Sequence, residues 1–296
     1  MENVQILSNS FKDNDMEEQR FETVIKPQNG WFDLHLSELV RYRDLIFLFV
    51  KRNFTAHYKQ TILGPAWAII QPLLTTIIFT VVFGNIAGLT PVGVPPFLFY
   101  LSGNIIWQYF SNCITGTAST FTANAAILGK VYFPRLVMPI STVLSQLIAF
   151  AIQFIFFVLF LGYYVITSSY VRPNFCVLLL PVFVLQLAML GLGFGIIIAS
   201  CTTKYRDLAM LVSFGVQLWM YATPVAYDIE FISERFLPYY LLNPVTPVII
   251  AMRNAFLGVG YFPIKYYLIG WGSTIAILLF GIIIFNRVEK IFMDTV

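Results

Sequence analysis

Few side chains in this sequence have the type and spacing that catalytic chemistry requires. The Asp-Asn-Asp triplet at 13–15 has the D-x-D pattern with which nucleotide-sugar enzymes hold a metal, but its surroundings show no α/β pattern. Gly129-Lys130 is the only Gly-Lys pair, and it lacks the neighbouring residues of a phosphate-binding loop. The two histidines, His35 and His57, are remote from other ligand-type residues. The sequence therefore predicts neither a catalytic residue nor a metal site.

Three glycines with the spacing of a nucleotide loop also have a simpler explanation. Gly191, Gly193 and Gly195 lie inside an apolar run that no strand precedes. Small residues at such positions let neighbouring membrane helices approach closely. We therefore interpret them as packing positions.

The composition predicts an integral membrane protein. The 296 residues are 58% hydrophobic and 11% charged, whereas about a quarter of the residues in a soluble domain are charged. The net charge of +3 is spread over several loops and does not indicate nucleic-acid binding. The cysteines lack C-x-x-C spacing, so we interpret them as small packing residues. They are Cys113, Cys176 and Cys201.

Six apolar runs have the length of about twenty residues that crosses a bilayer core. They are 66–86, 97–117, 136–163, 175–200, 208–227 and 266–285. The predicted fold is an all-α polytopic membrane protein. Because these runs contain no carboxylate of the kind that proton-coupled transport needs, the pattern points to energy from a separate ATPase.

The basic residues predict that both termini are cytoplasmic. Cytoplasmic loops carry an excess of Lys and Arg, and with this orientation fourteen of the 18 fall in inner segments. The remaining four would lie outside: Arg172, Arg235, Arg253 and Lys265.

Residues 36–63, which follow a polar tail at 1–35, are predicted to form an amphipathic helix in the membrane interface. At 100° per residue one face is apolar: Leu39, Tyr42, Ile46, Phe49, Val50 and Phe54. The opposite face is polar: Arg41, Asp44, Lys51, Arg52, Thr55 and Lys59. We expect Gly64 to close this helix in a left-handed conformation and Pro65 to begin the next.

Residues 228–264 are apolar but interrupted by Pro238, Pro244 and Pro247. Each apolar piece is about ten residues long, which is too short to span. We predict a re-entrant hairpin of two short helices on the outer side. Such a hairpin would border a cavity or exit vestibule, where irregular backbone is tolerated.

The inner loop at about 120–137 contains the sequence "KVYFPR". It could simply connect two spans. It could also dock a partner, because Lys130, Tyr132, Phe133 and Arg135 would present aromatic rings beside charges to the cytoplasm. The residue pattern alone leaves both interpretations open.

Four aromatic residues near polar positions are candidates for lining a conduit. They are Trp107, Tyr109, Trp219 and Tyr221. Rings in such a conduit could stack on sugar faces without holding them tightly. For any single ring, packing explains the position better than a channel role, and interfacial anchoring explains most of the other aromatic residues.

Four stretches of the sequence resemble the membrane subunit of bacterial polysaccharide ABC exporters, the type-2 ABC permease family. The first, at 42–84, begins "YRDLIFLFVKRNFTAHYKQTILGPAW". The others are "GKVYFPRLVMPIS", "TTKYRDL" and "QLWMYATPVAYDIEFISERF" followed by "LNPVTPVI". The resemblance covers about 36–288, and only the polar tail before residue 31 is longer than the family requires.

The resemblance implies a homodimer with two cytoplasmic ATPase subunits, which would hold the ATP and magnesium. This chain would hold no cofactor. It implies export of a lipid-linked polysaccharide such as O-antigen, capsule or teichoic acid across the bacterial inner membrane. It also implies that Lys130–Arg135 is a coupling helix on the ATPase and that 228–264 forms the outer gate. The loop at Lys59, Leu63, Gly64 and Pro65 would meet the lipid diphosphate.

Three other functions remain to be compared with this one. A type-2 ABC exporter of a small lipid or drug would have the same fold, and its channel width and partner gene would distinguish it. A membrane-embedded enzyme of lipid-linked sugar metabolism would need His, Asp or Glu within its spans. An ion channel would need a charged or carbonyl-lined filter, and nothing in the sequence resembles one.

Overall fold

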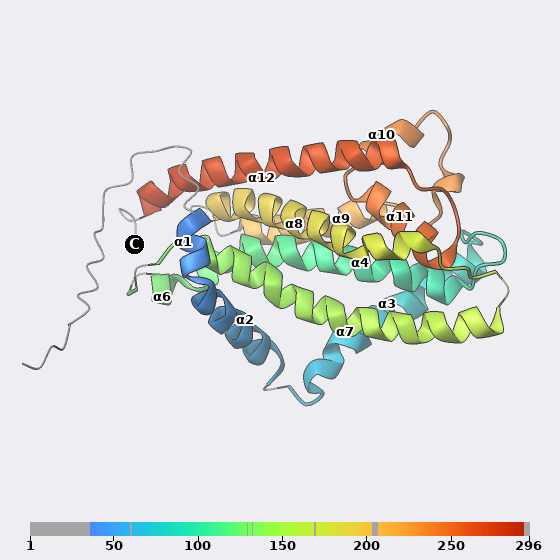
Figure 1. Cartoon of the computed structure of the whole chain (residues 1–296), viewed down its shortest axis with the longest axis horizontal. Helices are drawn as coiled ribbons and strands as arrows, with labels where there is room; N and C mark the ends of the chain where they lie inside the picture. The colour runs from blue at the N-terminus through green and yellow to red at the C-terminus, as the bar shows by residue number, and fades with distance from the viewer. Residues whose placement is uncertain are drawn as a thin grey trace, which may run out of the picture. The chain divides into compact units, whose positions relative to one another are not determined.

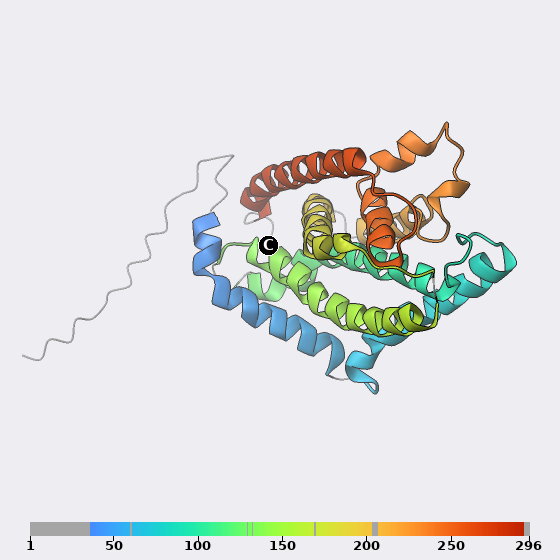
Figure 2. The same cartoon turned by 45° about the vertical axis from the view of Figure 1, so that its right-hand side comes forward.

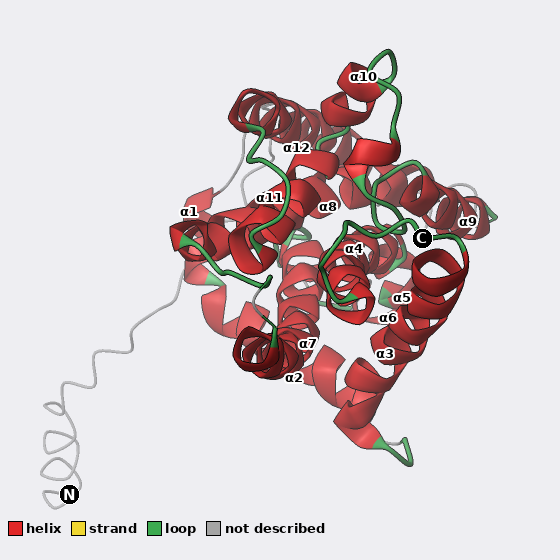
Figure 3. Cartoon of the chain, turned by 90° about the vertical axis from the view of Figure 1, so that its right-hand side faces the viewer, coloured by secondary structure: helices red, strands yellow, loops and turns green. Residues whose placement is uncertain are grey.

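A computed structural model of the chain describes residues 36–59, 61–128, 130–131, 133–168, 170–202 and 207–292. The side chains of 36–38 and 288–292 are not among the described parts. Across these residues the chain is helical and forms no strand, as Figure 3 shows. The all-α prediction is therefore confirmed for the described residues. The predicted tail at 1–35 and its Asp-Asn-Asp triplet lie outside them.

Twelve α-helices and four short 3-10 or π segments make up the described chain. The first half contains α1 (Leu36–Arg41), α2 (Arg43–Tyr58), η1 (Gly64–Ala66), α3 (Trp67–Phe79), η2 (Thr80–Ile86), α4 (Pro96–Ala118), α5 (Thr120–Ala123), α6 (Ala125–Leu128) and α7 (Val137–Thr167). The second half contains η3 (Phe175–Leu179), α8 (Leu180–Thr202), α9 (Leu208–Tyr221), η4 (Ile229–Phe231), α10 (Leu237–Leu242), α11 (Thr246–Leu257) and α12 (Ile264–Phe292).

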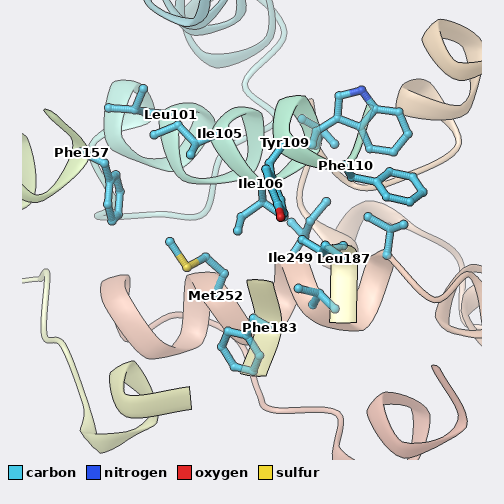
Figure 4. Packing of buried hydrophobic residues seen from close by; sticks show 14 of the residues in the cluster. Leu101, Ile105, Ile106, Tyr109, Phe110, Phe157, Phe183, Leu187, Ile249 and Met252 are labelled. Atoms are coloured by element: carbon cyan, nitrogen blue, oxygen red, sulfur yellow. The ribbon is translucent and has the colours of Figure 1, made fainter. Parts of the chain in front are cut away.

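Helix α4 is the centre of the bundle. It packs against α3, α7, α8, α9 and α11, and Figure 3 shows it surrounded by other helices. Most of its side chains are buried in protein. Figure 4 shows part of this core, in which residues of α4 meet residues of α7, α8 and α11. The labelled side chains include Leu101, Ile105, Phe157, Leu187 and Met252. The central position explains why α4 can carry polar residues that a lipid-facing helix would avoid.

Within the described residues, four helical segments are long and apolar enough to cross a membrane. They are Gly64–Ile86, Val137–Thr167, Phe175–Thr202 and Ile264–Arg287. They correspond to the first, third, fourth and sixth predicted runs. The other two predicted runs fall on α4, which is long but less apolar, and on α9, which has only 14 residues. A membrane protein is therefore supported, with four spans evident from length and composition.

Small residues bring α8 close to its two main neighbours, as the sequence predicted. A Cβ at Gly195 would lie 2.4 Å from the Cβ of Thr117 on α4, and a Cβ at Gly193 would lie 3.0 Å from the Cα of Leu278 on α12. Cys113 is buried beside Gly191, which confirms the packing interpretation for that cysteine. Cys201 is exposed, so the same interpretation is wrong there.

The predicted hairpin and the predicted coupling loop lie at opposite ends of the helices. Figures 1 and 2 place α10 and α11 at one end of α12 and α7, and α1 and α6 at the other. In the hairpin region, α10 and α11 contact each other and α12. The two short helices that the prolines predicted are therefore present.

Candidate functional site

The corner between α2 and α3 has the backbone that its Gly-Pro sequence predicts. Gly64 has a φ of +52°, a left-handed conformation that glycine adopts without a Cβ penalty. Pro65 lies in the first turn of η1. The helix ends at Tyr58, earlier than predicted, and the Thr61 hydroxyl donates a 2.9 Å hydrogen bond to the Tyr58 carbonyl. The chain thus turns from α2 into α3 within a few residues.

Exposed side chains surround this corner. Ile62 is fully exposed, Leu63 is 47% exposed, and Trp67 at the start of α3 is 45% exposed. Lys59 is also exposed. Two apolar side chains, an indole and an ammonium group together suit a position where a protein surface meets lipid headgroups.

The apolar face of α2 packs against protein. Phe49 of α2 and Leu39 of the preceding α1 are buried in a cluster with Phe133, Val137 and Met138, from the start of α7 and the loop before it. The Phe49 and Phe133 ring centroids are 5.7 Å apart. This contact holds α2 against α7.

Arg52 lies on the protein side of α2, although the periodicity placed it on the polar face. Its Nη2 donates a 2.7 Å hydrogen bond to the Oδ1 of Asn124, and its guanidinium carbon lies 4.6 Å from the Phe49 ring centroid. Burial lowers the pKa of this guanidinium from its usual value. Arg52 thus links α2 directly to the loop between α5 and α6.

The four predicted docking residues have different environments. Lys130 is exposed and Arg135 is half-buried, while Tyr132 lies outside the described residues. Phe133 is only 5% exposed. The expectation that its ring projects into the cytoplasm is therefore wrong, because Phe49 and the start of α7 cover it. The neighbouring Val131 is 57% exposed and was not among the predicted residues.

Most of the predicted channel aromatics pack inside this chain. Trp107 is 4% exposed and Tyr109 is 3% exposed, so the expectation that these rings face a conduit is wrong. Trp107 lies 6.2 Å from the ring of Trp219, and Tyr109 lies 5.2 Å from that of Phe150. Tyr221 alone among the four is substantially exposed, at 48%. Edge-to-face packing stabilises such aromatic clusters.

Two adjoining cavities of about 410 and 370 Å³ lie between α2, α3, α4 and α7. They share five lining residues: His57, Tyr58, Gly116, Gln146 and Ala149. Trp67, just beyond the corner, lines the second cavity. Burial raises the pKa of the Tyr58 phenol, so the phenol stays neutral at physiological pH. The cavities therefore begin at the corner and extend along the first half of α7.

Five of the twelve residues that line the second cavity carry side-chain amides, and sequence reasoning missed most of them. Three helices contribute five amides: Gln71, Gln108, Asn112, Gln146 and Gln153. A helical signal was present, since the α4 pair has i, i+4 spacing and the α7 pair has i, i+7 spacing. The sequence drew attention to the aromatic residues nearby instead.

A second missed feature is the buried arginine of α11. Arg253 was expected in an outer segment, but it is 4% exposed. Its Nη1 donates to the carbonyls of Pro224 at 2.8 Å and Tyr227 at 3.3 Å, and its Nη2 donates to that of Val225 at 2.9 Å. Its guanidinium carbon lies 3.6 Å from the Phe99 ring centroid. Arg253 thus joins the turn after α9, the hairpin and α4.

The sequence as a whole is similar to known transporter subunits. The profile of the ABC-2 type transporter family matches residues 44–257, and the chain belongs to that family. It is 29% identical over 252 residues to an "O-antigen export system permease protein RfbA" of Klebsiella pneumoniae, covering 85% of this chain and 94% of the relative. A protein of the same name in Myxococcus xanthus is 32% identical over 199 residues, covering 67% of this chain and 74% of the relative.

Proposed function

We propose that this chain is the channel-forming membrane subunit of an ATP-driven exporter that moves lipid-linked polysaccharide across the bacterial inner membrane. O-antigen is the expected cargo. The observation that carries this proposal is the similarity over 85% of the chain to a protein named as an O-antigen export permease. The apolar helical bundle supports it, because export across a bilayer needs such a subunit.

The proposed assembly is a homodimer of this chain with two cytoplasmic ATPase subunits, which bind ATP and magnesium. Six spans and cytoplasmic termini complete the topology. Helix α4 has 23 residues, or about 34 Å of rise. It is therefore long enough to cross the bilayer core while the surrounding helices cover it from lipid. Helix α9 would cross together with the turn that follows it. The location of the hairpin and the coupling loop at opposite ends supports this arrangement.

The loop at about 120–137 is proposed to transmit motion from the ATPase. Exposed Lys130 and the adjacent Arg135 would contact the ATPase. The buried Phe133 would pass the motion to α2 through Phe49, and Asn124 would pass it through Arg52. Since α2 ends at the corner, the same motion would reach Lys59, Leu63, Gly64 and Pro65. That corner is the proposed entry for the lipid diphosphate, and 228–264 is the proposed outer gate.

Complementation tests the function. The test strain is the native host of this chain with the gene for the chain deleted and the gene for its partner ATPase kept. Surface polymer should return when the chain is expressed from a plasmid. Intracellular accumulation of lipid-linked polymer should fall at the same time. Normal membrane insertion of the chain without restored surface polymer would contradict the proposal.

The coupling role has a separate test. Lys130→Gln with Arg135→Gln should abolish most polymer export while ATP hydrolysis by the complex continues. The matched control is Lys265→Gln with Arg235→Gln, which neutralises two exposed residues at the hairpin end. Export at the wild-type rate by the first pair would remove the coupling assignment.

A further inference from the structure

The two cavities beside the corner are built from groups that bind uncharged polar molecules. Among the described residues that line them, none is Asp, Glu, Lys or Arg. The second cavity instead receives five side-chain amides from α3, α4 and α7. The volumes of about 410 and 370 Å³ lie in the range of about 300–1,000 Å³ typical of small-molecule sites.

These amides have unused hydrogen-bonding capacity. Gln153 is 4% exposed, and its Oε1 is buried without a hydrogen-bond partner. The side chains of Gln71, Gln108, Asn112 and Gln146 form no hydrogen bond with any other described residue either. An unsatisfied polar group in an apolar interior costs about 1–3 kcal/mol. That cost applies to Gln153, since Gln71 is exposed and Gln108, Asn112 and Gln146 are half-buried. The buried Gln153 oxygen therefore favours a polar occupant, and the four other amides supply further donors and acceptors to it.

The chemistry of the amides selects the kind of occupant. Each amide both donates and accepts hydrogen bonds, and so does a hydroxyl group. A phosphate only accepts, and it would be held best by cations, which this lining lacks. Arg52, whose partners Asn53 and Asn124 line the first cavity, already donates to the side-chain oxygens of both. An acyl chain would satisfy none of the amides.

The second cavity lies next to the corner between α2 and α3. Tyr58 and Trp67 stand on either side of the corner and both line the second cavity. Their flat rings can cover the apolar face of a sugar while the amides bind its hydroxyls. The lining residues of α7 extend from Thr142 to Gln153, about 16 Å along the helix, which is long enough for more than one sugar unit.

We propose that this amide-lined cavity is a glycan-binding site within one protomer. It binds uncharged, hydroxyl-rich sugar units next to the lipid anchor while the diphosphate occupies the corner. The assignment rests on the proposed export function for the identity of the glycan. Its binding chemistry follows from Gln71, Gln108, Asn112, Gln146 and Gln153 alone.

A binding experiment tests the site without requiring export. The full chain with its ATPase is placed in phosphatidylethanolamine nanodiscs and titrated with maltohexaose, with tryptophan fluorescence as the signal. We expect a saturable change that disappears in the Trp67→Phe variant. The Gln146→Leu, Gln153→Leu double variant should bind about tenfold more weakly or worse, because several hydrogen bonds to hydroxyls are lost.

Gln186→Leu is the matched control. Gln186 on α8 is also fully buried, with its amide unpartnered, but it lines neither cavity. It should bind maltohexaose like the wild type. If the double variant on α7 does not fold, Gln108→Leu with Asn112→Leu makes the same test from α4.

Three results would overturn the proposal. One is equal maltohexaose affinity in wild type and in a folded double variant. Another is a loss of pyrophosphate binding in the folded Gln146→Leu, Gln153→Leu variant, because it would place the anion in the cavity and not at the corner. The third is a Trp67 signal that responds to phosphatidylglycerol in the nanodisc but not to maltohexaose, which would indicate a lipid headgroup site. Successful complementation together with any of these results would remove the glycan site and leave the export function intact.

Discussion

The hairpin end and the cavity beside α2 and α3 both bury polar side chains, but they treat them in opposite ways. At the hairpin, both Nη atoms of Arg253 donate to backbone carbonyls and the guanidinium stacks on Phe99, although its Nε has no partner. Beside α3, the buried Oε1 of Gln153 has no partner, although space surrounds it. A buried group that donates several hydrogen bonds to the backbone stabilises a conformation, whereas a buried group with no partner beside a cavity favours a ligand.

This difference distinguishes a polar side chain that stabilises the fold from polar side chains that are available to bind a ligand. The Arg253 contacts join the turn after α9 to α11 and α4, so they hold these elements together. The side-chain amides of the cavity form no hydrogen bond that joins one described element to another. Substitutions at the two places should therefore have contrasting effects on stability.

The largest effect is expected for Arg253→Met. The substitution leaves the carbonyls of Pro224, Val225 and Tyr227 without a donor, and each unsatisfied group costs about 1–3 kcal/mol. The free energy of unfolding should fall by about 4 kcal/mol or more, as measured by denaturant unfolding of the purified protein in micelles. Arg235→Met, at an exposed position of the same region, should change it little. Equal stabilities of the two variants would remove the structural role of Arg253.

A smaller effect is expected for Gly64→Val at the corner. A Cβ there would meet only the Tyr58 carbonyl at 4.0 Å, so the cost comes from the left-handed backbone. That cost is about 1–2 kcal/mol, which should shift the corner without unfolding the bundle. Surface polymer should fall more than the amount of protein in the membrane.

The control for the corner is Gly162→Val on α7. Gly162 is exposed, has nothing near its Cβ position and has no left-handed backbone. Both variants add the same side chain, so the comparison isolates the conformation at residue 64. Undiminished export with valine at residue 64 would reduce the Gly-Pro sequence to a simple bend.

The smallest effect on stability is expected for Gln153→Leu. Leucine has a similar size and removes an unsatisfied oxygen, so the unfolding free energy should stay within about 0.5 kcal/mol of wild type or rise. The same micelle unfolding assay measures it. A loss of more than about 2 kcal/mol, of the size typical for a broken buried hydrogen bond, would show that Gln153 is structural. The contrast with Arg253 would then fail.

Several elements were predictable because their signals are local. The apolar runs of 137–167 and 264–287, the left-handed Gly64, and the close packing at Gly193 and Gly195 all follow from a few neighbouring residues. The six-span count was less predictable, since α4 is buried by protein and α9 is short. High hydropathy is needed where a helix faces lipid. A central helix that other helices cover can cross the membrane with lower hydropathy.

The site was harder to predict because it depends on which helix faces contact each other. Periodicity placed Arg52 on a polar face. In the structure it donates a hydrogen bond to Asn124, 72 residues away, and so joins two elements. The sequence pattern predicted that the Phe133 ring is exposed, but in the folded chain it packs against Phe49. Gln71, Gln108 and Gln153 come from three helices, so their convergence has no signature along the chain.

The sequence by itself determined the membrane character, the helical segments, the corner at Gly64-Pro65 and the family resemblance. These depend on composition and on interactions within one or two turns, which the residue order encodes directly. Only the tertiary structure decided that Arg253 is held by backbone carbonyls, that Trp107 and Tyr109 belong to the core, and that amides meet in a cavity. Those outcomes depend on contacts between residues far apart in sequence, which exist only after the helices have packed.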